Sequence, residues 1–134
     1  MRPYLSIIIP YYNSSDTIER LLLSIKGSKH APSYEVIVVD DGSLPSLSFR
    51  PQSRNPDGSR VKPGMTVRTI RFDRNHGPAV ARNRGVAKAR GKFVVFLDSD
   101  VELFGDTLHN IATIYTDDPD IVALTGVWVK EQKS

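Results

Sequence analysis

The chain has 134 residues, 40% of them hydrophobic, and a formal net charge of +3, which fits one soluble α/β-sized domain. It contains no cysteine, so disulfides, thiolate metal sites and cysteine nucleophiles are excluded, and we expect a cytoplasmic protein. Apolar runs such as residues 93–97 are far shorter than the roughly 20 residues of a membrane span, and Pro10 interrupts the only signal-like stretch near the N-terminus.

Short runs of apolar, β-branched residues predict the strands. Continuous apolar runs of this kind are typical of strands that are covered on both faces in a parallel sheet. The predicted strands are residues 4–10, 34–40, 67–72, 92–98 and 121–129.

Helical periodicity appears between these runs. Ile18, Leu21, Leu22 and Ile25 follow the i, i+3, i+4, i+7 pattern of an amphipathic helix that stops at Gly27. Asp16 and Glu19 have the spacing of a capping box at its start. Two more helices are predicted over residues 78–89, which begin with a proline and are followed by Gly91, and over residues 107–115.

Alternating strands and helices predict a doubly wound, mostly parallel sheet with helices on both faces. On the second helix, 100° per residue places Asn83 on the apolar face, so we expect it to be a buried polar group. Residues 44–66 interrupt the alternation. They are rich in Pro, Ser and Arg, and we expect an exposed connection there.

Polar residues follow four of the predicted strands, where ligands bind in open parallel sheets. The segments are residues 10–13 (PYYN), 40–43 (DDGS), 73–77 (DRNHG) and 98–100 (DSD).

Asp98 and Asp100 would project to one side if the strand stayed extended, and they could then share Mg²⁺ or Mn²⁺. The alternative is that one caps the next helix and the other is solvated. The carboxylates of Asp40 and Asp41 could accept hydrogen bonds from a pyrimidine base or a ribose, or could form an Asx turn that leaves the sheet.

Tyr11 and Tyr12 could stack on a base or cover the sheet edge, and Tyr12 lies nearer the loop. Arg82 and Arg84 lie on opposite margins of the second helix's apolar face, so periodicity does not say which one points into the cleft. Either could pair with a diphosphate.

Together, four segments resemble the N-terminal part of a family 2 glycosyltransferase with the GT-A fold. They are residues 6–13 (SIIIPYYN), 35–43 (EVIVVDDGS), 75–85 (NHGPAVARNRG) and 93–100 (FVVFLDSD). The resemblance implies a Rossmann-like domain over residues 1–134 that is incomplete after the donor-binding half.

What the resemblance implies for individual residues is a nucleotide-sugar site. Pro10, Tyr12 and Asp41 would contact the nucleoside, with Asp41 facing the base, and Asn75 and Arg82 would lie near the ribose and diphosphate. Asp98, Ser99 and Asp100 match the D-x-D signature. In that signature Asp100 is the more direct ligand of Mn²⁺ or Mg²⁺ and Asp98 lies nearer the ribose and sugar.

The implied reaction is an inverting transfer of sugar from a UDP-, GDP- or dTDP-sugar to a hydroxyl of a glycan, lipid or other acceptor. A carboxylate base would activate that hydroxyl, and we expect the base and the acceptor loops beyond Ser134. Peripheral membrane association of the full-length protein is a further expectation.

The charge distribution leaves other functions open. Residues 44–92 hold 12 Lys/Arg and two Asp, whereas residues 93–134 hold two Lys and eight acids. A basic nucleic-acid-binding domain fits the first segment, but its basic residues lack interleaved aromatics, and we expect no nucleic-acid partner. A phosphoaspartyl protein and a non-catalytic nucleotide-binding module are the remaining alternatives.

Overall fold

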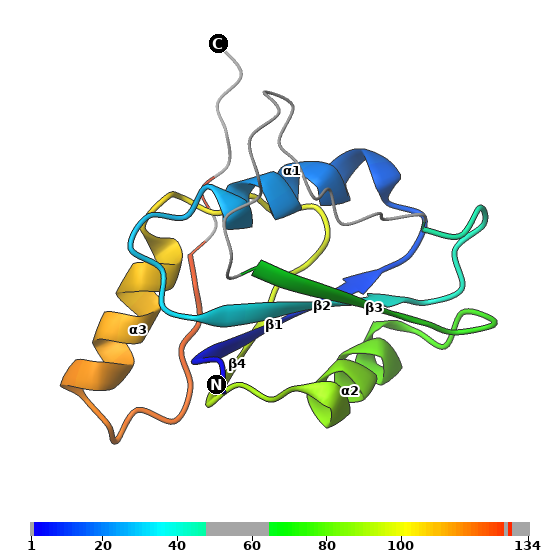
Figure 1. The fold of residues 1–134 in the computed structure, drawn as a ribbon. Helices are drawn as coiled ribbons and strands as arrows, with labels where there is room; N and C mark the ends of the chain where they lie inside the picture. The colour runs from blue at the N-terminus through cyan, green and yellow to red at the C-terminus, as the bar shows by residue number, and fades with distance from the viewer. Residues whose placement is uncertain (1, 48–64, 128, 130–134) are drawn as a thin grey trace, which may run out of the picture.

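The computed structural model describes residues 2–47, 65–127 and 129. These residues form a parallel sheet and the helices that pack on it (Figure 1). In chain order the elements are β1 (Leu5–Tyr11), α1 (Ser15–Lys26), β2 (Tyr34–Asp40), β3 (Met65–Arg71), α2 (Pro78–Lys88), β4 (Phe93–Phe96) and α3 (Thr107–Asp117).

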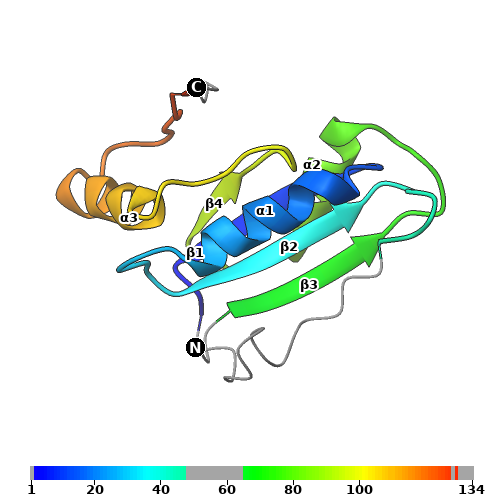
Figure 2. The same ribbon diagram turned by 90° about the horizontal axis from the view of Figure 1, so that it is seen from above.

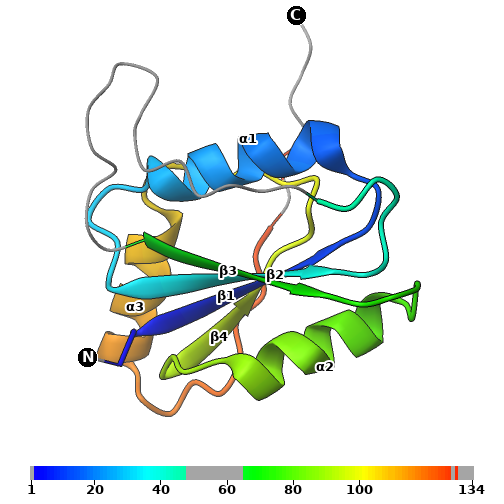
Figure 3. The same ribbon diagram turned by 45° about the vertical axis from the view of Figure 1, so that its right-hand side comes forward.

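The sheet has the strand order β3-β2-β1-β4, and every neighbouring pair is parallel. The chain moves outward from β1 to β3 and then returns to place β4 on the other side of β1. Helix α1 consequently lies on one face and α2 on the other, as Figures 1 and 3 show. The predicted doubly wound fold is confirmed. The order of strands reverses between β1 and β4, and this is where open sheets of this type bind ligands.

The face under α1 holds the larger core. Alternate residues of β1 and β2 point into it and meet the predicted apolar stripe of α1, whose four members are all buried. Helix α3 adds Leu108 to the same core. Seen from above in Figure 2, α1 lies along the strands that it covers. Helix α1 ends as predicted, because the Gly27 N–H bonds to the Leu23 carbonyl at 2.9 Å.

The start of α1 differs from the prediction. Ser14 is the N-cap residue, so Asp16 is already inside the first turn and the Asp16/Glu19 capping box does not form. The Ser14 hydroxyl donates instead to the Tyr12 carbonyl at 2.8 Å. The N-cap therefore lies two residues before the expected cap at Asp16.

The predicted inward face of α2 is wrong. Asn83, Val80 and Val86 are exposed, and α2 packs on the sheet through Ala81 and Gly85. A Cβ on Gly85 would lie 2.4 Å from Cγ2 of Ile8, so the contact requires glycine. Ala81 and Gly85 are small and add little hydrophobicity to the sequence pattern. The pattern therefore indicates the side of α2 that carries the valines and not the side that contacts the sheet.

The predicted strand over residues 121–129 is also wrong for its described part. Residues 121–127 form no strand, and Val122 and Val127 are 94% and 90% exposed. An apolar run forms a strand only when a neighbouring strand takes up its hydrogen bonds. Among the described residues nothing pairs with the outer edge of β4, where Phe96 is exposed.

Most of the expected connection at 44–66 lies outside the described residues, which resume at Met65. Residues 44–47 are described: Leu44 is exposed, whereas Leu47 packs against the core under α1. Within the described ranges, no helix has the length and hydropathy of a membrane span.

Candidate functional site

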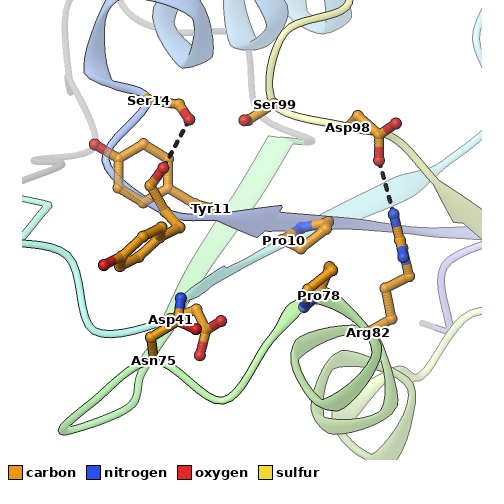
Figure 4. Close-up of a pocket in the computed structure, with 10 residues that line it drawn as sticks. Pro10, Tyr11, Ser14, Asp41, Asn75, Pro78, Arg82, Asp98 and Ser99 are labelled. Atoms are coloured by element: carbon orange, nitrogen blue, oxygen red, sulfur yellow. Dashed lines mark hydrogen bonds and ion pairs between the residues drawn. The ribbon is translucent and has the colours of Figure 1, made fainter.

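A cavity of about 250 Å³ opens at the carboxyl ends of β1, β2 and β4, around the point where the strand order reverses. Figure 4 shows side chains from both sides of the sheet edge converging on it. Its lining residues are Pro10, Tyr11, Tyr12, Ser14, Asp41, Asn75, Pro78, Arg82, Asp98 and Ser99. All seven residues predicted for the nucleotide sugar are in this set, although they come from four separate segments. Asp100 is not.

Asp41 ties the end of β2 to the loop before α2. Its side chain is 3% exposed, and its two oxygens accept hydrogen bonds from the backbone N–H groups of His76 at 2.7 Å and Gly77 at 2.9 Å. Each carboxylate oxygen can accept a second hydrogen bond. Asp41 therefore holds the loop in place and retains capacity toward the cavity.

Gly42 allows this loop to approach. Its φ is +80°, and a Cβ there would lie 2.5 Å from the carbonyl carbon of Arg74. Only glycine fits this combination of backbone angle and contact. The close approach of the two loops at Gly42 brings Asn75 over the end of β2 and into the cavity wall.

Asp40, the neighbour of Asp41, serves the scaffold. Its buried carboxylate accepts hydrogen bonds from the N–H groups of Ser43 and Leu47 and from Arg71 at 2.8 Å. Burial alone would raise the pKa of Asp40, but these donors and the charge of Arg71 outweigh it and hold the pKa below its usual value. The two adjacent aspartates therefore have different roles. Asp40 stabilises the fold, whereas Asp41 lines the cavity.

A second pair of contacts fixes the loop that carries Tyr12. The Asn13 N–H donates to the Ser43 hydroxyl at 2.9 Å, and the Asn13 side-chain oxygen accepts from the Leu44 N–H at 3.0 Å. The loops after β1 and β2 are consequently locked together. The residue types alone did not reveal this link, because it depends on the in-register pairing of β1 and β2.

The two tyrosines lie in different environments. Tyr11 continues the inward alternation of β1 and is 3% exposed, and burial, with a smaller contribution from the negative charge of Asp40, raises the pKa of its hydroxyl. Tyr12 is 48% exposed. Tyr12 is thus the aromatic ring with a free face at the cavity. Ser14 and Pro78, which sequence reasoning did not select, line the cavity because they begin α1 and α2.

Arg82 and Asp98 meet across the cavity, with 2.9 Å between Nη2 and Oδ1 (Figure 4). Arg84 is exposed and lines no part of the cavity. Both partners of the ion pair are partly exposed, at 36% and 53%. Exposed pairs of this kind contribute little to stability, so the two side chains are free to exchange partners when a ligand enters.

The extension on which the same-side arrangement of Asp98 and Asp100 depends does not persist. Strand β4 ends at Phe96, and a turn follows in which the Val101 N–H approaches the Asp98 carbonyl at 3.4 Å. Asp100 lies exposed in this turn.

Within the described ranges, no three His, Asp or Glu side chains gather as a protein-only metal site. Mg²⁺-type sites commonly use one or two carboxylates and complete their shell with substrate phosphates and water. Asp98 at the cavity and Asp100 two residues later fit that limited role by chemistry.

Comparison with known proteins identifies a family of similar sequences. A sequence model of glycosyl transferase family 2 matches residues 6–134. The succinoglycan biosynthesis protein ExoO of Rhizobium meliloti is 35% identical over 132 residues, which cover 92% of this chain and 35% of ExoO. A GalNAc(5)-diNAcBac-PP-undecaprenol beta-1,3-glucosyltransferase of Campylobacter jejuni is 31% identical over 109 residues, covering 81% of this chain and 33% of that enzyme.

Two solved structures share the fold. S. aureus TarS 1-349 in complex with UDP-GlcNAc superimposes with a TM-score of 0.73 at 28% identity, covering 98% of this chain and 37% of TarS. The mannosyltransferase PcManGT of Pyrobaculum calidifontis, in complex with GDP-Man and Mn²⁺, gives a TM-score of 0.67 at 28% identity, covering 88% and 34%. The chain thus spans roughly a third of the length of each of these proteins.

Proposed function

The chain belongs to glycosyltransferase family 2, and from this premise we propose that its cavity binds the nucleotide-sugar donor of a glycosyl transfer reaction. One observation carries the proposal: seven residues from four distant segments line a single cavity at the switch point of the sheet. Membership of the family selects this function over the phosphoaspartyl and nucleic-acid-binding alternatives.

Each cavity residue has a chemical role in this proposal. The free face of Tyr12 stacks on the base, and Asp41 accepts hydrogen bonds from the base with the lone pairs that the loop leaves free. Asn75 contacts the ribose. Arg82 turns from Asp98 to the diphosphate, with which a guanidinium forms charge-assisted hydrogen bonds.

Asp98 and Asp100 would hold Mn²⁺ or Mg²⁺, together with oxygens of the diphosphate. The neighbour PcManGT was solved with GDP-Man and Mn²⁺, which supports a divalent ion in this role. When bound, such an ion offsets the negative charge that develops on the departing diphosphate. In this proposal, Arg82 leaves Asp98 to bind the diphosphate, and Asp98 then becomes available to the metal ion.

The reaction we propose is an inverting transfer to an acceptor hydroxyl. The acceptor oxygen forms a bond to C1 of the sugar while the bond between C1 and the phosphate oxygen breaks, and the bonding electron pair leaves with the nucleoside diphosphate. A carboxylate base takes the acceptor proton. Asp41 and Asp98 are already engaged with protein donors, so we place the base outside this set of cavity residues.

The acceptor class is part of the proposal. The Campylobacter relative is named for an acceptor on undecaprenol diphosphate, and a glycan carried on such a lipid is the acceptor we propose here. The donor is a UDP-, GDP- or dTDP-sugar, since the neighbours were solved with UDP-GlcNAc and GDP-Man.

Calorimetric titration of the chain with UDP, GDP and dTDP, each with and without Mn²⁺, tests the proposal. We expect one of the three to bind at a single site and more tightly with Mn²⁺. Folded protein that shows no metal-dependent binding of any of them at millimolar concentration would overturn it.

A further inference from the structure

A set of basic side chains lies along α2 and at its C-terminal end, away from the cavity. We name this set the α2 basic patch. Its members are Arg2, Arg68, Arg84, Lys88 and Arg90. The nucleotide-sugar site uses none of them.

Hydrogen bonds show that the C-terminal part of the patch is one cluster. Arg2 donates to the carbonyls of Arg90 at 2.7 Å and Gly91 at 3.2 Å, and Arg68 donates to the Lys88 carbonyl at 2.6 Å. Each guanidinium keeps further N–H donors beyond these contacts. Chain segments far apart in sequence thus contribute cations to the same end of α2.

One carboxylate, Glu35, neutralises part of this charge from below. It accepts hydrogen bonds from Arg68 at 3.1 Å and from the Arg90 guanidinium at 3.2 Å, but it is 1% exposed. Its negative charge is therefore inside the protein, whereas the Arg90 side chain is 61% exposed. Asp117 ends α3 and Asp118 and Asp120 follow it, and α3 packs on the face of the sheet opposite α2.

The helical part of the patch is not explained by folding. Arg84 and Lys88 are four residues apart and so share one stripe of α2, where two like charges repel and slightly destabilise the helix. Helix α2 contains no acidic residue. In the part of the chain that the structure describes, neither side chain forms an ion pair.

The same stripe continues into an apolar residue. Val80 lies four residues before Arg84 and is 46% exposed. Figures 1 and 3 show α2 as the outermost described element on its side of the sheet. An outward helix face that combines basic and apolar side chains suits the boundary between lipid headgroups and acyl chains.

We propose that the α2 basic patch docks the protein on an anionic lipid surface. Lys and Arg bind such a surface through its negative potential, and Val80, on the same stripe as Arg84, enters the headgroup region. Pro78 and Arg82 of the same helix line the cavity, so docking would keep the cavity at the edge of the bilayer. The choice of lipid over another polyanion rests on the lipid-linked acceptor in the proposed function and on the scarcity of aromatic residues for base stacking.

Sedimentation with vesicles tests the proposal. The 134-residue chain is mixed with phosphatidylcholine vesicles that either contain or lack phosphatidylglycerol. We expect binding only when phosphatidylglycerol is present, with loss of binding at high salt. Since each basic residue near an anionic surface changes partitioning about fivefold, Arg84→Glu/Lys88→Glu should weaken binding at least about 25-fold.

The matched control is Arg20→Glu/Lys29→Glu, which makes the same change in net charge on and directly after α1. It should bind vesicles far better than the α2 double variant. The proposal is overturned if the two double variants lose binding equally, if neither loses it, or if the wild type ignores anionic vesicles but binds random-sequence DNA at the same salt concentration. Nucleotide titration of the α2 variant separates the two proposals, because Arg84 and Lys88 lie outside the cavity and that binding should be unchanged.

Discussion

Nη2 of Arg82 lies 2.9 Å from Oδ1 of Asp98, and this contact closes the candidate site between α2 and the end of β4. Both side chains are partly exposed and line the cavity. Their pairing places one cation and one carboxylate where a diphosphate and a divalent ion would each find a partner.

Arg82→Ala should weaken binding of the preferred nucleoside diphosphate. A hydrogen bond to a charged group contributes about 1.5–3 kcal/mol, so we expect Kd to rise about 10- to 100-fold. Arg84→Ala, two residues away on the exposed side of α2, is the control and should leave Kd unchanged. The assignment of the diphosphate to Arg82 fails if Arg84→Ala has the larger effect in calorimetry.

Asp41→Asn should affect both binding and stability. Replacing one carboxylate oxygen with an amide NH₂ sets a donor against the N–H of His76 or Gly77, so a buried hydrogen bond is lost and unfolding free energy should fall by about 1–3 kcal/mol. Urea denaturation measures this change, and nucleotide titration measures the accompanying loss of affinity. Asp73→Asn in the same loop is the control, because Asp73 is 88% exposed. Equal destabilisation by the two variants would contradict the role given to Asp41.

Gly85→Ala should destabilise the fold, because its Cβ would collide with Ile8. Overpacking of this kind costs about 1–3 kcal/mol in unfolding free energy. Gly126→Ala is the matched control, since a Cβ there meets nothing within 4 Å. In a double-mutant cycle, Ile8→Ala should relieve part of the clash. Additive effects of the two substitutions would show that α2 does not rest on the sheet at this point.

Several parts of this fold follow from the residues alone, and the exceptions have physical causes. The apolar strands and the stripe of α1 were predicted because large buried residues repeat with the period of their element. The packing face of α2 was not, because Ala81 and Gly85 contribute close contact instead of hydrophobic area. The described part of the strand predicted at residues 121–129 did not form, because its apolar character does not supply a pairing partner.

The candidate site was predicted to a similar extent. Ligands bind at the strand ends of open parallel sheets, and this rule predicted that Asp41, Asn75 and Asp98 lie close together. The structure places all three in the lining of one cavity. Periodicity could not choose between Arg82 and Arg84, since both flank the helix face that it predicted. The turn after β4 removed Asp100 from the cavity, because local hydrogen bonding at the strand end overrides the two-residue alternation of an extended chain.

The acid sensitivity of the fold should depend on Glu35. Burial would raise the pKa of Glu35, but hydrogen bonds from the Arg90 N–H and the Ser6 hydroxyl, with the charges of Arg90 and Arg68, lower it below 4.5. A carboxylate with a lowered folded pKa stabilises the fold above its unfolded pKa, and that contribution is lost as the pH falls from about 4.5 through the folded value. Asp40 behaves alike below its ordinary value of 3.8.

Urea denaturation at pH 7, 4 and 3 measures this dependence. Glu35→Gln should be less stable than the wild type at pH 7 and should lose less stability on acidification. Asp16→Asn, an exposed position on α1, should follow the wild-type profile. An unchanged pH profile in Glu35→Gln would contradict the role of the buried carboxylate.

The claim that this cavity is the nucleotide site is tested most directly by amide chemical shifts of the labelled chain during titration with UDP or GDP and Mg²⁺. We predict that the largest shifts fall on Tyr12, Asp41, Asn75 and Ser99, which come from four segments and meet only at the cavity. Saturable shifts concentrated elsewhere, for example on the outer faces of α1 and α3, would contradict the claim.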